Sequence, residues 1–348
     1  MVFEFNDIIE EHKRKYPRME IQDYVKLAYQ NEFGPLHLGE KEKLCKFIQM
    51  ELSQLPAGAE GFTAEEIGNG LSRISLSGLP HPETDAPLLA KLMILTMENH
   101  QGTMEGLGEK LAVLESKQGS EAKNWMDAYR AEGCPPVHHS ETYRRAYEPH
   151  YRVLKTEYAD WLPVLSEIAD LLAGQERVVI SIDGRCGSGK SSLADLIKEV
   201  FDGNVFHMDD FYLPFDRRAE DWMETPAGNM DLERFKEEVL LPAKEGKEVL
   251  YRPFNCQAGM ESEAVPTAPA KLTVIEGSYS QHPVLADQYD LKIFLTCDSE
   301  RQKERLEKRN GEYAKVFFAR WVPMEERYFE AFGIEKKSDK VLDTGRFW

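Results

Sequence analysis

The sequence predicts an α/β fold, in which a parallel sheet flanked by helices follows an all-α N-terminal domain. From residue 178 onward, short apolar runs alternate with helical segments, and a glycine-rich loop follows the first run. Up to about residue 174, the apolar residues keep helical spacing and form no convincing strand. We therefore expect a helical domain of unknown role over residues 1–174 and an α/β domain over residues 175–348.

Three helices of the first half are predicted from their ends. Apolar residues within 21–29 share one helix face, and Gly34 is expected to end that helix. The segment 63–66, Thr-Ala-Glu-Glu, has the pattern of a capping box and predicts a helix start. A long helix is expected over 149–174.

The second half alternates between strand and helix patterns, as parallel sheets do. The predicted strands are 178–182, 205–208, 272–275, 291–296 and 340–342. The predicted helices are near 191–201, 231–245, 299–310 and 323–332. Ligands of such sheets collect at the carboxyl ends of the strands, so the residues after each strand are the candidates for chemistry.

The glycine-rich loop has the pattern G-x-x-x-x-G-K-[ST], filled by Gly184, Gly189, Lys190 and Ser191. Glycines allow positive φ and close approach to an anion, so backbone N–H groups can converge on phosphate oxygens. Lys190 is expected to reach the β and γ phosphates, and the Ser191 hydroxyl to ligate Mg²⁺. The alternative is a glycine-rich turn before an ordinary helix. The candidate nucleotide-binding residues are Gly184, Arg185, Cys186, Gly187, Ser188, Gly189, Lys190, Ser191 and Ser192.

Carboxylates follow the second and third predicted strands. Asp209 and Asp210 come after the second strand, where a carboxylate can take the proton of an attacking hydroxyl. A turn or helix cap is the structural alternative for these two aspartates. Glu276 ends the third strand and is expected to hold Mg²⁺ directly or through water.

An arginine stripe follows the fourth strand. Arg301, Arg305 and Arg309 recur every four residues and so share one helix face. An exposed basic face paired with glutamates explains such a run, but arginines after a strand of a phosphate-binding domain also suit the oxygens of a transferring phosphoryl group.

Charge and composition limit the kinds of partner that the chain is expected to bind. The chain has 61 acidic and 43 basic residues and a net charge of −18, so nucleic acid is not expected as a partner. Five scattered cysteines without C-x-x-C spacing indicate neither a disulfide framework nor a zinc site, which favours a cytoplasmic location. We see no signal peptide and no bilayer-spanning apolar stretch, and expect no membrane partner. The sequence leaves open whether the chain forms a homo-oligomer.

Five motifs together resemble the uridine kinase and phosphoribulokinase group of P-loop kinases, over roughly the second half of the chain. The motifs, in chain order, are 181–192, 208–212 (Met-Asp-Asp-Phe-Tyr), 274–277 (Val-Ile-Glu-Gly), 305–309 and 321–326. The resemblance implies a P-loop nucleoside-kinase-like fold that uses ATP and Mg²⁺ and phosphorylates a hydroxyl of a small molecule.

The resemblance also implies roles for single residues. Asp209 would be the catalytic base, Tyr212 would lie beside the acceptor, and Glu276 would serve the metal. Arg305 with Arg309 would belong to a closing lid that stabilises the transferring charge together with Lys190.

Three further residues concern the acceptor and the nucleotide base. Asp339 matches a position near the adenine in uridine kinases. Tyr251 would border the acceptor pocket, but 251–257 lacks the His followed by Arg that uridine kinases carry there: it has no His, and Arg252 directly follows Tyr251. Asp231 could face the substrate, and a helix N-cap explains it about as well. Hydrogen-bonding groups discriminate strongly between polar substrates, so the departure of 251–257 from the uridine kinase pattern argues against uridine as the substrate.

We therefore expect an ATP-dependent kinase whose acceptor is a hydroxyl of a nucleoside, uridine-like or cytidine-like, or of a related metabolite. A kinase for a vitamin precursor or a sugar phosphate is one alternative. A regulatory protein gated by the nucleotide, with the helical half binding a partner, is the other.

Overall fold

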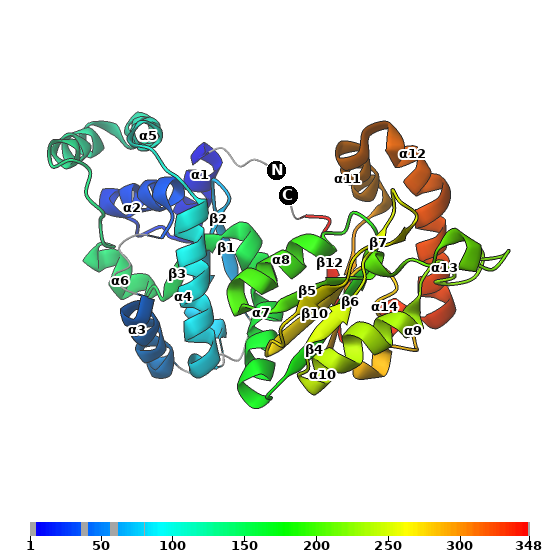
Figure 1. Ribbon diagram of the computed structural model, residues 1–348. Helices are drawn as coiled ribbons and strands as arrows, with labels where there is room; N and C mark the ends of the chain where they lie inside the picture. The colour runs from blue at the N-terminus through cyan, green and yellow to red at the C-terminus, as the bar shows by residue number, and fades with distance from the viewer. Residues whose placement is uncertain (1–4, 36–40, 56–61, 80, 347–348) are drawn as a thin grey trace. The chain divides into compact units, whose positions relative to one another are not determined.

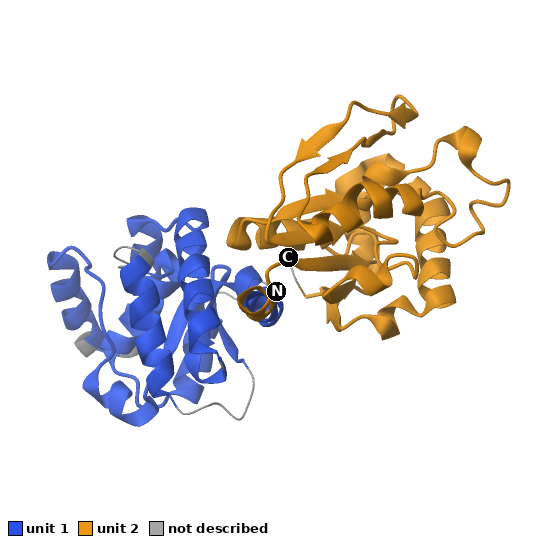
Figure 2. Cartoon of the chain, turned by 60° about the horizontal axis from the view of Figure 1, so that its bottom comes forward, with its two compact units in different colours: residues 1–169 blue, residues 170–348 orange. Residues whose placement is uncertain are grey.

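The computed structural model describes residues 5–35, 41–55, 62–79 and 81–346 (Figure 1). The chain divides into two compact units, residues 1–169 and 170–348 (Figure 2). Within the described ranges, no helix combines the length and the apolar character that crossing a bilayer requires.

The first unit is mainly helical and also contains a three-stranded antiparallel sheet in the order β1-β2-β3. Its helices are α1 (Phe5–Lys15), α2 (Ile21–Phe33), α3 (Lys41–Gln54), α4 (Pro82–Asn99), α5 (Met104–Ala131), α6 (Glu141–Tyr147) and most of α7 (Thr156–Gly174). Its strands are β1 (Ala64–Gly68), β2 (Leu71–Ser75) and β3 (Tyr151–Lys155). The predicted helix that ends at Gly34 is confirmed as α2.

This sheet corrects two expectations from the sequence. The segment 63–66 begins strand β1 rather than a helix, and the long helix begins at Thr156 because the residues before it form β3. A tight turn at Gly68-Asn69-Gly70, with positive φ at all three residues, pairs β1 with β2. Pairing with distant strands therefore overrides the local helical pattern, and the first half is not all-α.

The second unit contains the predicted parallel sheet. Five strands lie in the order β12-β11-β4-β10-β5, and every neighbouring pair is parallel. The strands are β4 (Val178–Gly184), β5 (Asn204–His207), β10 (Leu272–Glu276), β11 (Leu291–Thr296) and β12 (Lys340–Asp343). β4 is buried along its whole length, which explains why most of its residues are apolar on both faces. The predicted α/β fold is thus confirmed.

Helices flank this sheet, and α8 contacts β4, β5 and β10. The helices are α8 (Lys190–Phe201), α9 (Leu232–Phe235), α10 (Leu241–Glu245), α11 (Ser299–Asn310), α12 (Ala314–Val316), α13 (Val322–Phe332) and α14 (Ile334–Lys337). Two π-helical segments, 236–240 and 317–321, connect α9 to α10 and α12 to α13. Two small antiparallel ribbons are additions to the prediction: β6 (Val249–Tyr251) with β9 (Val265–Thr267), and β7 (Phe254–Asn255) with β8 (Met260–Glu261).

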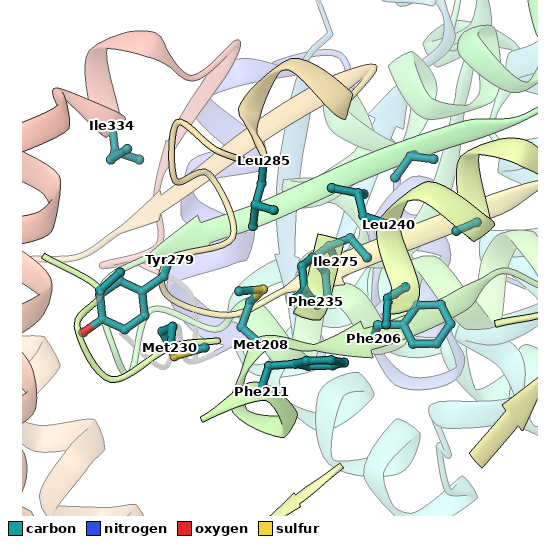
Figure 3. Close-up of a cluster of buried hydrophobic side chains, with 14 of the residues drawn as sticks. Phe206, Met208, Phe211, Met230, Phe235, Leu240, Ile275, Tyr279, Leu285 and Ile334 are labelled. Carbon is teal, nitrogen blue, oxygen red and sulfur yellow. The ribbon is translucent and has the colours of Figure 1, made fainter. Parts of the chain in front are cut away.

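An apolar cluster on the sheet anchors the segment that carries the two aspartates (Figure 3). Met208 and Phe211 are fully buried in this cluster, on either side of Asp209 and Asp210 in a short 3₁₀ turn. Full burial of side chains of this size stabilises the fold by about 1.5–3 kcal/mol each. The anchored turn fixes the backbone of both aspartates at the end of β5.

Gly184 lies where β4 packs closely against β11, and its substitution tests that packing. It has φ +137°, and a Cβ added there would lie 2.0 Å from the carbonyl oxygen of Leu295. Since backbone cannot move aside cheaply, we expect Gly184→Ala to lower the free energy of unfolding by about 3 kcal/mol or more, measured by urea denaturation.

Gly259→Ala is the matched control. Gly259 also has positive φ, +69°, but no heavy atom lies within 4 Å of its added Cβ. We expect this variant to lose only about 1 kcal/mol, from the backbone conformation alone. Equal losses in the two variants would contradict the close approach at Leu295.

Candidate active site

A cleft of about 650 Å³ lies at the carboxyl ends of the central strands. It is lined by residues from the loop after β4, the turn after β5, the segment after β10, and α11 to α13. The lining residues are Cys186, Gly187, Gly189, Lys190, Ser191, Ser192, Asp209, Tyr212, Cys256, Glu276, Gly277, Ser278, Tyr279, Arg305, Lys308, Arg309, Tyr313, Phe317, Trp321 and Glu325. The structure therefore brings most of the predicted site residues together.

The phosphate-binding loop has the backbone that its glycines predict. Gly187 and Gly189 have φ +76° and +94°, and α8 begins directly after them. The Lys190 ammonium donates hydrogen bonds to the carbonyl oxygens of Gly184 (2.7 Å) and Arg185 (3.1 Å). A helix N-terminus of this kind attracts anions, so loop and helix together form a cradle for phosphate groups.

Three loop residues do not line the cleft. Gly184 packs against β11, the Ser188 side chain is buried, and Arg185 pairs with Glu326 at 2.7 Å. Cys186 does line it, but burial raises the pKa of its thiol, so a reactive thiolate is not favoured there.

Glu276 and Ser191 lie side by side in the cleft and offer two oxygen ligands of the kind that Mg²⁺ prefers. The Ser191 hydroxyl donates to Glu276 Oε1 at 3.3 Å, and the carboxylate side chain is only 8% exposed. Among the described residues, no group of three or more His, Cys, Asp or Glu side chains could hold a metal by itself. The pair suits Mg²⁺, which usually takes one or two protein oxygens and completes its shell with phosphate and water oxygens.

His207 is a neighbour of this pair that the sequence analysis did not single out. It ends β5 and stands in register with Glu276 of β10, and its Nδ1 lies 2.5 Å from Glu276 Oε1. The hydrogen bond to the carboxylate raises the pKa of the imidazole. The signal available in the sequence was its place at a strand end, two residues before Asp209.

The two aspartates after β5 have different surroundings. Asp209 lines the cleft, and its Oδ1 accepts a hydrogen bond from the Tyr212 hydroxyl at 2.7 Å. Asp210 is not among the lining residues, and its Oδ2 accepts from the Tyr251 hydroxyl at 3.2 Å. Burial raises the pKa of Asp210. The geometry therefore favours Asp209 as the carboxylate that faces a bound acceptor.

The two predicted lid arginines both line the cleft and have distinct contacts. Arg305 donates to the Gly187 carbonyl oxygen at 3.2 Å and to the Thr344 carbonyl oxygen at 2.6 Å. Arg309 lies over the Phe317 ring, 5.4 Å from its centroid. Arg305 thus braces the phosphate-binding loop against the segment after β12.

Besides the three loop residues, Asp231, Tyr251 and Asp339 also lie outside the cleft lining. Asp231 is the N-cap of α9 and pairs with Arg217 at 3.1 Å, as the capping alternative expected. Tyr251 stacks on Phe211, with ring centroids 5.5 Å apart.

The structure does not bring Asp339 to the cleft, contrary to the expectation of a place near the adenine. It comes just before β12, and its carboxylate accepts from the Lys292 N–H at 2.8 Å. That is the amino end of the strand, whereas the cleft lies at the carboxyl ends.

Comparisons with known proteins agree with this fold. No family model matches the chain. A curated relative, the nicotinamide riboside kinase of Schizosaccharomyces pombe, is 26% identical over 157 residues, which are 39% of this chain and 68% of the relative. The loop, the parallel sheet and this relative give the chain the P-loop kinase fold of the uridine kinase and phosphoribulokinase type, over about half its length.

Solved structures of low identity are also similar. A possible uridine kinase from Bacillus stearothermophilus is 21% identical with a TM-score of 0.40, covering 51% of this chain and all (100%) of its own. A candidate kinase of a fructose transport system from Silicibacter sp. is 22% identical with a TM-score of 0.41, covering 48% of this chain and 90% of its own.

Proposed function

We propose that the chain is an ATP-dependent kinase that transfers the γ-phosphoryl group to a hydroxyl of a ribonucleoside or a closely related small metabolite. One observation carries the proposal. A single cleft is lined by a phosphate cradle with Lys190 and Ser191 and by the Asp209–Tyr212 pair. A triphosphate and an alcohol bound in that cleft would have a proton acceptor beside them.

The nucleotide side is built by the loop and α8. Backbone N–H groups of the loop would hold the phosphates, with Lys190 leaving its carbonyl partners for phosphate oxygens. Ser191 and Glu276 would hold Mg²⁺, which neutralises charge on the phosphates when bound. Arg309 lines the same cleft and would stabilise charge on the transferring group.

The acceptor side is built by the anchored turn after β5. The Tyr212 hydroxyl holds one oxygen of Asp209 and leaves the other for the acceptor hydroxyl. Asp209 would take the proton as the oxygen attacks the γ phosphorus. Because Met208 and Phe211 fix the turn, the carboxylate needs little rearrangement to act.

A riboside is the acceptor class that we favour. The curated relative is named for nicotinamide riboside, which is both a nucleoside and a vitamin precursor. The segment after Tyr251 has no His, and its Arg252 stands directly after Tyr251 rather than after a His as in uridine kinases, which argues against a uracil base as the preferred one.

The test is a product assay with purified chain and Mg·ATP. The panel contains nicotinamide riboside, uridine, cytidine, a sugar phosphate and a vitamin-precursor alcohol, and mass spectrometry detects a phosphorylated product. We expect transfer to at least one riboside, with nicotinamide riboside above uridine. Failure with every member, together with ATP hydrolysis that responds to a protein partner, would overturn the kinase proposal in favour of a nucleotide-gated switch.

A further inference from the structure

Tyr279 has an unusual backbone for an aromatic residue. It follows β10 in the turn after Glu276-Gly277-Ser278 and has φ +77°. Bulky side chains rarely adopt positive φ, and the surrounding structure must stabilise the strained backbone where they do. Residues with such a backbone cluster at ligand-binding and active sites. The same residue lines the cleft.

The Tyr279 ring is fixed, whereas its hydroxyl lacks a partner. The side chain is only 4% exposed, and its ring packs edge-on against Tyr328 with centroids 4.9 Å apart. The hydroxyl oxygen is buried and has no hydrogen-bond partner among the described residues. In Figure 3 this oxygen points away from the apolar cluster that packs beneath the ring. A buried hydroxyl without a partner is costly, so its position calls for a reason.

The other cleft hydroxyls near this residue already have acceptors. Tyr212 donates to Asp209 at 2.7 Å, and Ser278 donates to Glu325 at 2.6 Å. Burial raises the pKa of the Tyr279 phenol, with the carboxylates of Glu325, Asp183 and Asp209 adding to the effect. Tyr279 therefore stays protonated and keeps a donor for which the described part of the chain provides no acceptor.

We propose that Tyr279 is a specificity-determining residue whose hydroxyl donates a hydrogen bond to a second polar oxygen of the acceptor molecule. This inference rests on the proposed kinase function and deepens it. Because the hydroxyl is covered, reaching the acceptor takes a small shift of the strained turn that follows β10. An acceptor with two oxygens, such as a ribose carrying neighbouring hydroxyls, suits a site in which one oxygen meets Asp209 and another meets Tyr279.

The test is Tyr279→Phe, which removes the hydroxyl and keeps the ring. With nicotinamide riboside and uridine as probes, we expect kcat/KM for the acceptor to fall about 10- to 100-fold. The KM for ATP and the slow ATP hydrolysis without acceptor should stay unchanged. The thermal midpoint should not fall, because the deleted hydroxyl makes no hydrogen bond to any residue that the structure describes.

Tyr289→Phe is the matched control. The Tyr289 hydroxyl is also buried without a hydrogen-bond partner among the described residues, but Tyr289 does not line the cleft. This variant should keep wild-type kinetics with both probes. A Tyr279→Phe enzyme within twofold of wild type for the acceptor would overturn the inference and leave the kinase function standing. A wild-type chain that phosphorylates neither probe nor any other panel member would overturn both.

Discussion

Asp209→Asn is expected to lower kcat for phosphoryl transfer at least a hundredfold, the usual scale for loss of a general base. The amide keeps an oxygen that can accept from the Tyr212 hydroxyl, so the turn should keep its shape. It cannot take a proton from the acceptor. The Kd for ATP should stay within about twofold of wild type, because a general base acts on the acceptor rather than on the nucleotide. Steady-state kinetics and calorimetric titration with ATP measure the two quantities.

Asp210→Asn is the matched control for this variant. The neighbouring carboxylate belongs to the same turn, but it contacts Tyr251 and does not line the cleft. We expect its kcat to stay within about threefold of wild type. Near-normal turnover in Asp209→Asn, or an equal loss in both variants, would remove Asp209 from its role as the base.

Lys190→Ala is expected to give the second large effect. Loss of the cation that we propose to act on the transferring group should lower kcat/KM for ATP by about 10²- to 10³-fold. The Kd for ATP should rise as well, since in the proposed role the ammonium would contact the phosphates in both ground and transition states. The variant also removes two hydrogen bonds to loop carbonyls, so its thermal midpoint should fall slightly.

Lys198→Ala controls for the change of charge. Lys198 is exposed in the last turn of the same helix, α8, at the end away from the loop. Its removal should leave the Kd for ATP and kcat unchanged. Unchanged ATP affinity together with full turnover in Lys190→Ala would contradict the assignment of the loop.

The sheet of the second unit was predictable because its strands carry local signals. β4 and β10 are buried along their whole length and are largely apolar in sequence, and a glycine-rich loop separates β4 from α8. In a parallel sheet the carboxyl ends of all strands lie at one edge, where ligands bind. This explains why Lys190, Asp209 and Glu276 could be placed in one cleft from the sequence.

The first unit was harder because its sheet depends on pairing between distant residues. β2 pairs with β3 in a register that joins Leu71 to Lys155. Because 149–174 has helical periodicity, the residues of β3 were predicted as helix. The capping-box pattern at 63–66 likewise predicted a helix start where β1 lies. The turn 68–70, with its Gly-Asn-Gly sequence, is the local signal that would have indicated a hairpin.

Side-chain contacts between different helices and strands could not be predicted from the sequence, for a similar reason. The partnership of His207 with Glu276 depends on the register of β5 and β10. Asp339 was assigned from the resemblance to uridine kinases rather than from its place in the sheet, and it precedes β12, at the amino end of that strand. Tyr279 carries no motif at all, and its positive φ appears only in the folded backbone.

The most direct test is a crystal structure of the chain with Mg²⁺ and a nonhydrolysable ATP analogue. We predict triphosphate oxygens within hydrogen-bond distance of the backbone N–H groups of 187–191, and a terminal phosphate that faces Asp209 in the cleft. An analogue bound elsewhere, or a loop 184–191 closed against its own protein with no room for a triphosphate, would contradict the central claim.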